Sequence, residues 1–147
     1  MKLRGVCMKF RKINSDYVIK MEKGDDLVKE ITKLCKSENI KGGYFTGIGA
    51  VSNVKLGWFN PVEKVYQTKD FDQYFEITSL VGNIGRLPNG DPLVHNHVTL
   101  SDSNFNVTAG HLFEGKVSLA VEIFIRDLGE ELEKAQDPEF HLNFLKL

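Results

Sequence analysis

The chain has 147 residues, of which 41% are hydrophobic and 27% are charged, and its formal net charge is −1. This balance is typical of a globular protein with a buried core and excludes a largely disordered chain. The length fits one domain, so we expect a single domain over residues 1–147. A near-neutral chain has no surplus of cations for a run of phosphates, which argues against strong nonspecific DNA binding.

The sequence also indicates where the protein works. Its two cysteines, Cys7 and Cys35, lack the paired spacing of a zinc knuckle or a redox pair and are expected to be small buried apolar residues. No segment reaches the roughly 18 consecutive apolar residues that a membrane span needs, and the N-terminus lacks the apolar run of a signal peptide. We therefore expect a soluble, cytoplasmic protein with no membrane partner.

The N-terminal third predicts a hairpin followed by a helix. Strands are expected over residues 5–12 and 17–22, joined by a turn at Asn14-Ser15-Asp16. The segment Gly24-Asp25-Asp26 then opens a helix. Its apolar positions recur at the helical spacing i, i+4, i+7 and i+8, and they are Leu27, Ile31, Leu34 and Cys35. This stripe should pack on one face of a sheet.

A glycine-containing segment, Tyr44–Val51, follows the helix. In a strand, Gly47 and Gly49 indicate a bulge or a close approach of two backbones. The alternative is a loop that cradles phosphate. A dinucleotide-binding fingerprint requires a third glycine and a following helix, whereas here a β-forming run continues to Phe59. The pattern favours the strand.

The rest of the chain predicts short strands separated by turns such as Asn60-Pro61. We expect them at residues 54–59, 63–68, 74–82, 93–100 and 116–126, with a last one in the tail near 140–145. Because few helical patterns lie between them, an antiparallel sheet is more economical than repeated βαβ units. The predicted fold class is α+β, mainly an antiparallel sheet with one principal flanking helix.

Three histidines carry the clearest chemical signal. His95 and His97 would project from the same side of a strand, because side chains alternate with period two, while Asn96 would point away. His111, brought in from the next loop or strand, would complete a three-imidazole set that binds zinc and leaves one position open. Imidazole ligands alone leave nickel, iron and manganese as alternatives. The other interpretation is a group of surface or hydrogen-bonded histidines.

A catalytic role would also need a group that transfers protons. Glu76 and Glu114 are the first candidate carboxylates, and Asp102 and Glu122 are the second choice. Lone acidic residues on strands or turns are, however, usually solvated or structurally paired. His141 is interpreted as a tail residue. Neither the catalytic residues nor the existence of an enzyme activity follows from the sequence.

Several aromatic residues allow two interpretations. They could form a stacking platform for single-stranded nucleic acid, but such platforms combine aromatics with a basic groove, which a near-neutral chain does not offer. We expect them to pack in the core and at a subunit interface instead: Tyr44, Phe45, Trp58, Phe59, Tyr74 and Phe75.

Four segments, taken in order, resemble the plants-and-prokaryotes-conserved (PPC) domain family: 42–51, 75–83, His95-Asn96-His97 and 110–117. The resemblance implies an α+β, PPC-like fold assembled as a homotrimer, with a divalent metal on the three histidines. It is to the stand-alone prokaryotic type, described as predicted DNA-binding proteins related to plant AT-hook proteins. No Arg-Gly-Arg-Pro hook occurs in the sequence, and Ala109 replaces the usual first glycine before Gly110-His111.

Together these observations give a first hypothesis and two alternatives. The first is a stand-alone PPC-domain protein, DNA-binding or regulatory, with a divalent metal, Zn²⁺ before others, on His95, His97 and His111. The second is a small metal-dependent enzyme of the hydrolase or lyase type that uses a metal-activated water. The third is a purely structural metal. The expected partners are copies of the same chain, DNA despite the charge, and a small-molecule ligand at the metal.

Overall fold

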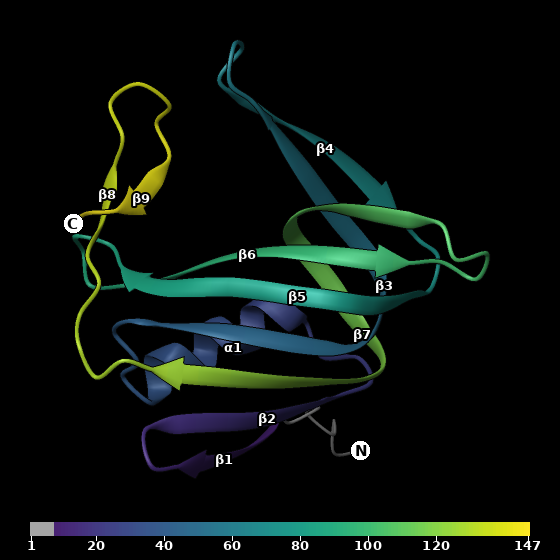
Figure 1. Cartoon of the computed structure of the whole chain (residues 1–147), viewed down its shortest axis with the longest axis horizontal. Coiled ribbons are helices and arrows are strands. Elements are labelled where there is room, and N and C mark those ends of the chain that lie inside the picture. Colours follow the sequence, from purple (N-terminus) through teal and green to yellow (C-terminus); the bar gives the residue numbers. More distant parts are fainter. Residues whose placement is uncertain (1–7) are drawn as a thin grey trace, which may run out of the picture.

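The computed structural model describes residues 8–147 (Figure 1). The start of the strand expected from residue 5, and Cys7 with it, lie outside the described residues. The elements in chain order are β1 (Lys9–Ile13), β2 (Asp16–Glu22), α1 (Leu27–Ser37), β3 (Gly43–Asn60), β4 (Val65–Phe71), β5 (Phe75–Arg86), β6 (Pro92–Ser101), β7 (Val107–Asp127), β8 (Lys134–Gln136) and β9 (Asn143–Leu145). Within this described part, no helix is long and apolar enough to cross a membrane.

The strands form one large antiparallel sheet and a small hairpin. The seven-stranded sheet has the order β1-β2-β7-β6-β5-β3-β4, and β7 also pairs with β3. This extra pairing closes β3, β5, β6 and β7 into a ring. Strands β8 and β9 pair with each other as a separate small sheet, the yellow hairpin in Figure 1, and Glu133, just before β8, forms a single bridge with Arg86 at the end of β5. The predicted fold class, a mainly antiparallel sheet with one helix, is confirmed.

Strands β3 and β7 are longer than the sequence pattern predicted. Residues 44–51 and 54–59 form one continuous strand instead of two, and β7 begins well before residue 116. The pairing of these two strands shifts register between Gly49 and Val51 and again between Ser52 and Lys55. A β-bulge bends a strand without ending it. Residues whose sequence pattern resembles a turn can therefore remain part of one continuous strand.

The backbone at position 49 can be formed only by glycine without strain. Its φ is +148°, and a Cβ there would lie 2.3 Å from the Ala120 carbonyl oxygen and 2.6 Å from Val121 Cα. The pairing of β3 with β5 also shifts between Gly47 and Gly49. The bulge and the close backbone approach predicted for this segment are therefore confirmed, and the phosphate-loop alternative is wrong.

Helix α1 covers one face of the sheet and packs against β6 and β7. All four residues of its predicted apolar stripe are buried: Leu27, Ile31, Leu34 and Cys35. Burial raises the pKa of the Cys35 thiol to about 12, so this side chain stays protonated at neutral pH. The interpretation of Cys35 as a small buried apolar residue is confirmed.

The aromatic residues divide between the core and the surface. Phe45 and Phe75 are buried as predicted. Tyr44, Trp58 and Tyr74 are each more than half exposed, so for them the core interpretation is wrong. Their packing at a subunit interface stays a prediction.

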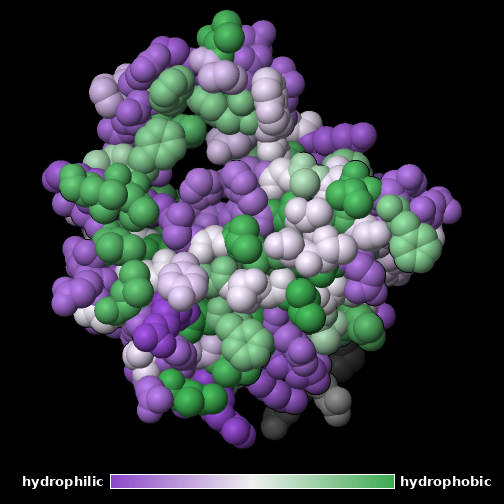
Figure 2. All heavy atoms as spheres, in the orientation of Figure 1, coloured by the Kyte–Doolittle hydropathy of each residue, from purple (hydrophilic) through white to green (hydrophobic). Residues whose placement is uncertain are grey.

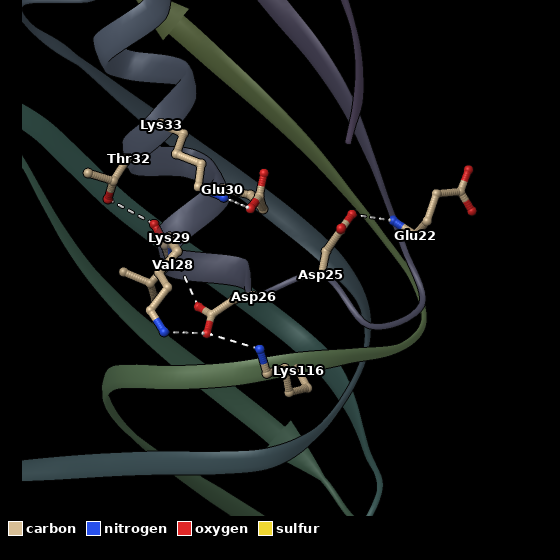
Figure 3. Close-up of polar contacts among 9 residues, drawn as sticks. All are labelled: Glu22, Asp25, Asp26, Val28, Lys29, Glu30, Thr32, Lys33 and Lys116. Atoms are coloured by element: carbon tan, nitrogen blue, oxygen red, sulfur yellow. Dashed lines mark hydrogen bonds and ion pairs between the residues drawn. The ribbon is translucent and has the colours of Figure 1, made fainter. Parts of the chain in front are cut away.

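Asp26 fixes the start of α1 and ties it to the sheet (Figure 3). Its Oδ1 accepts a hydrogen bond from the Lys29 backbone N–H at 3.3 Å, and its Oδ2 lies 3.2 Å from Lys29 Nζ and 3.4 Å from Lys116 Nζ on β7. Burial alone would raise the pKa of Asp26, but the hydrogen bonds from Lys29 and Lys116 outweigh it and hold this pKa below its usual value. The ionised carboxylate is therefore part of the folded structure.

We expect Asp26→Ala to lower the free energy of unfolding by about 1–2 kcal/mol at pH 7, because the helix loses its N-cap. A carboxyl whose pKa is lower in the folded state stabilises fully above its unfolded-state pKa, and this contribution disappears as the pH falls through the folded-state value. The gap in stability between the variant and the wild type should therefore narrow in acid. Denaturant unfolding at pH 7 and in acid measures this.

The matched control is Asp26→Asn, which keeps a cap acceptor but removes the charge. It should lose less stability than Asp26→Ala at pH 7. A gap between wild type and Asp26→Ala that stays constant into strong acid would contradict the role of the charge.

A candidate metal centre

Two adjacent strands present the three histidines. His95 and His97 lie on β6, where Asn96 between them is buried on the opposite side, as the period of two predicted. His111 lies on β7, directly opposite His97 in the sheet register, so the third imidazole comes from a strand. On the other side of β6, His95 is paired with Asn83 of β5.

The three imidazoles form one cluster. Their ring centroids are 5.2 Å apart for His95 and His97, 5.3 Å for His95 and His111, and 5.6 Å for His97 and His111. Each offers a ring nitrogen that lies within 4.8 Å of the other two. Ligand atoms around a tetrahedral zinc are about 3.4 Å apart, given bonds of about 2.1 Å, so the cluster is close to ligating spacing.

One ring nitrogen of this cluster is without a partner. His111 Nδ1 is buried, and within the described residues it makes no hydrogen bond. A buried polar atom that is left unpaired costs free energy, so such atoms in folded proteins usually face a partner that belongs to the site. A divalent ion held by neutral imidazoles is a partner of this kind, and the residues present therefore fit a metal.

The environment keeps two of the histidines neutral. Burial, together with the neighbouring His95 and His97, lowers the pKa of His111 to about 4. Burial lowers the pKa of His95 as well, and the charge of Lys134 and the proximity of His97 add to this effect. Neutral imidazole is the form that binds metal, so at pH 7 these two side chains are ready to act as ligands.

Aromatic side chains hold His111 from two directions. Its ring centroid lies 5.2 Å from that of Tyr66 on β4 and 4.5 Å from that of Phe113. Tyr66 in turn packs against Phe59 at 5.2 Å, and Phe59 contacts Phe140, in the loop between β8 and β9, at 6.2 Å. We call Tyr66, Phe59 and Phe140 the aromatic bridge. It connects the C-terminal hairpin to the arm formed by β3 and β4.

Between the hairpin and this arm the surface is hollowed, and hydrophilic atoms lie inside the hollow (Figure 2). A cavity of about 190 Å³ opens beside two of the histidines and is lined by Tyr66, Leu93, Val94, His95, His111, Leu142, Asn143 and Phe144. A wider groove of about 590 Å³ runs past all three histidines. The candidate ligands therefore face a space that is walled mainly by apolar and aromatic side chains.

The candidate carboxylates lie away from this space. Glu76 on β5 is opposite Ser101, which is four residues along β6 from His97, a separation of about 13 Å at the usual rise of a strand. Glu114 on β7 is exposed and paired with Lys55. Neither residue lines the cavity or the groove, and no other aspartate or glutamate of residues 8–147 does.

The other acidic candidates and His141 also have places outside the cluster. Asp102 accepts hydrogen bonds from the backbone N–H groups of Asn104 and Asn106 and so shapes its own loop. Glu122 is exposed on the distal half of β7. His141 is exposed in the tail, where it was expected.

Sequence reasoning missed three residues near the cluster: Tyr66, Asn83 and Lys134. The side chain of Lys134 on β8 is fully enclosed, with 1% of the residue exposed, and its ammonium donates to Asn83 Oδ1. Burial lowers the pKa of Lys134. A lysine in an acidic tail carries no sequence signal of burial, because the enclosure arises only when the hairpin docks.

The fold and the site define a class: a small α+β protein whose closed antiparallel sheet presents three clustered imidazoles beside a cavity. The model of the Plants and Prokaryotes Conserved (PCC) domain matches residues 8–129, and the chain belongs to this family. The resemblance seen in the sequence is thereby confirmed. Among curated proteins, none matches the chain.

Solved structures of similar proteins cover almost the whole chain. A putative DNA-binding protein from Bacteroides thetaiotaomicron is 30% identical with a TM-score of 0.91, over 95% of this chain and 96% of that one. A plant- and prokaryote-conserved protein from Pyrococcus horikoshii is 29% identical with a TM-score of 0.83, over 99% of both chains. A metal-containing protein from Archaeoglobus fulgidus is 30% identical with a TM-score of 0.83, over 96% of this chain and 99% of that one.

Proposed function

We propose that this chain binds one divalent metal ion through His95, His97 and His111, and that the ion belongs to a binding site for a small molecule. The observation that carries the proposal is the cluster itself, with the unpartnered His111 Nδ1 and a cavity beside it. The similar protein from Archaeoglobus fulgidus, which is described as metal-containing, supports it. Zn²⁺ is our first choice, because three imidazoles are a common zinc ligand set.

Held by His95, His97 and His111, the ion would have one further position for water or for an oxygen or nitrogen of a ligand, which it would polarise. The residues around the proposed ion would contribute in different ways. Burial, together with the neighbouring imidazoles, lowers the pKa of His95 and of His111 and so keeps these two side chains neutral, and apolar side chains wall one side of the cluster. Asn143 adds a polar group to these walls.

Elemental analysis of the purified protein tests the proposal. About one divalent ion per chain is expected after dialysis against Zn²⁺, and a chelator should remove it. Protein that retains no ion at micromolar metal would contradict the site.

We favour binding over catalysis because no carboxylate lines the cavity to move protons. The alternative is a metal-dependent hydrolase or lyase. It is supported by Tyr66, which lines both the cavity and the groove and whose pKa is raised by burial, so that its hydroxyl can donate a hydrogen bond to a ligand. Glu76 and Glu114 are the acidic candidates in this alternative. Chelator-sensitive turnover of an ester, a phosphoester or a lyase substrate would favour it.

DNA binding is the second candidate function. The observation in its favour is the description of the similar Bacteroides thetaiotaomicron protein as a putative DNA-binding protein. The net charge of −1 opposes it, because phosphate contacts need an excess of lysine and arginine on the contacting surface. We therefore propose a regulatory role through the small-molecule site ahead of direct DNA contact.

We expect no electrophoretic shift of duplex DNA at physiological salt. Titrations at low and physiological ionic strength check this, because genuine phosphate contacts give an affinity that falls steeply with salt. A shift with that salt dependence would establish DNA binding, and the metal-free protein, tested in parallel, would show whether the ion is needed.

We also propose that the chain assembles as a homotrimer and works in the cytoplasm. Support for self-association comes from apolar side chains on the adjacent strands β3 and β7, where Tyr44, Ile48 and Phe124 are 56%, 59% and 57% exposed. Exposed apolar patches of this kind commonly mark interfaces. The free thiol of Cys35 fits a reducing compartment.

A further inference from the structure

We propose that the cavity beside the histidines takes a small organic anion with an apolar body, of the monocarboxylate class, and that Lys134 supplies the positive potential that selects its charge. This inference rests on the proposed metal site and names the kind of ligand that the site accepts. Lys134 acts here as a positioning residue. It does not touch the ligand, because Asn83 and His95 lie between the two, and its electrostatic potential orients the charged group of the ligand.

The walls of the cavity determine the body of the ligand. Leu93, Leu142 and Phe144 contribute apolar surface, and Tyr66 contributes an aromatic face. A volume of about 190 Å³ corresponds to about six water molecules at roughly 30 Å³ each, which is room for a molecule the size of benzoate. Ligand sites of this kind gain affinity from apolar walls and take their orientation from a few polar groups.

The charge of Lys134 has no counterpart in the described structure. The residue is 1% exposed, no carboxylate among residues 8–147 lies within ion-pair distance of it, and the acceptor of its ammonium is the neutral Asn83 Oδ1. An ammonium has three donors, so a single acceptor leaves it poorly satisfied. A buried charge of this kind is expensive unless an opposite charge lies nearby.

The position of Lys134 directs its potential toward the cavity. Asn83, which accepts its hydrogen bond, is the register partner of His95, and His95 lines the cavity. Burial lowers the pKa of Lys134 itself, and an anion in the cavity would oppose this by stabilising the protonated form.

The balance of charge around the site favours an anion over a neutral ligand. Three neutral imidazoles do not reduce the charge of a divalent ion, and no aspartate or glutamate lines the cavity or the groove. Lys134 adds a further positive charge behind His95. In a partly buried site, where the effective dielectric constant is low, such an excess is best compensated by an anionic ligand.

Calorimetric titration of the zinc-loaded full-length chain with benzoate, and with benzamide as its neutral counterpart, tests the proposal. Benzoate should bind at least about tenfold more tightly than benzamide, because only the anion gains from the positive potential. In Lys134→Met, which replaces the ammonium by an apolar side chain of similar length, the preference should fall by about tenfold. Metal content is measured on every sample.

Two further variants complete the design. Lys146→Met is the matched control: this lysine is exposed, pairs with Glu133 at 3.1 Å and belongs to the same C-terminal region, so the preference for benzoate should remain. Asn83→Asp places a carboxylate against Lys134 without changing the shape of the side chain, and it should abolish the preference even if Lys134→Met fails to fold. Thermal melting verifies the fold of each variant.

The outcomes separate this inference from the metal site. One metal per chain with a preference for benzoate that depends on Lys134 supports both. Metal binding without that preference, or with a preference unchanged in Asn83→Asp, overturns the anion site alone. Benzoate binding that depends on Lys134, in protein that retains no ion after dialysis against Zn²⁺, supports the anion site and overturns the metal centre. Absence of both overturns both.

Discussion

Replacing His97 by alanine is expected to reduce the bound metal from about one ion per chain to a trace. In the proposed site all the protein ligands come from the cluster, and among residues 8–147 no carboxylate lines the surrounding space to take the place of a missing imidazole. Loss of a residue that merely supports a ligand costs about 10- to 100-fold in metal affinity, so loss of a ligand should cost more than about 100-fold. His97 is exposed, which makes it the ligand whose removal disturbs the core least.

Elemental analysis after dialysis against equimolar Zn²⁺ measures this effect. His141→Ala is the control, because that histidine is exposed and stands outside the cluster. The metal-free forms of His97→Ala and of the wild type should melt at the same temperature, which separates loss of a ligand from loss of the fold. Full metal content in His97→Ala would show that the ion is bound elsewhere.

Replacing Gly49 by alanine is expected to lower the free energy of unfolding by about 2–4 kcal/mol. The added Cβ would lie 2.3 Å from the Ala120 carbonyl oxygen, and the backbone φ of +148° is a conformation that alanine rarely adopts. Strand β3 would have to move away from β7 at this point, although the two strands are paired over most of their length.

The matched control is Gly115→Ala on β7. There an added Cβ would lie 3.6 Å from Leu112 Cδ1, an ordinary contact distance, so stability should change by less than about 1 kcal/mol. Denaturant unfolding of both variants gives the comparison. Equal losses would show that the glycines matter through the unfolded chain and not through the close approach of β3 and β7.

Features that depend on local periodicity could be predicted from the sequence. The helical spacing of Leu27, Ile31 and Leu34 identified α1 and its buried face. The alternation of His95 and His97 placed both imidazoles on one side of a strand, because the side-chain period of a strand is two wherever that strand lies. The glycines of β3 indicated a bulge for the same reason, since their conformational freedom is local.

Features that depend on distant segments could not be predicted. Tyr66 meets His111 only because β4 folds beside β3, and Lys134 meets Asn83 only because the C-terminal hairpin docks on β5. The start of β7 was placed too late, because pairing with β3 and β6 extends it through residues with weak strand preference, such as Ala109 and Gly110. In each case the position of the residue depends on segments that are distant in the sequence, and no local periodicity in a single sequence indicates which distant segments will be neighbours.

The aromatic bridge has a consequence for how this family can diversify. The family match ends at residue 129, yet Leu142, Asn143 and Phe144 beyond it form part of the cavity wall. The hairpin that carries them forms its own small sheet, which meets β5 through Lys134 and Asn83 and meets the β3–β4 arm through Phe140 and Phe59. Selection can therefore rewrite this tail, and with it the molecules that are admitted, while the imidazoles and the sheet that holds them stay unchanged.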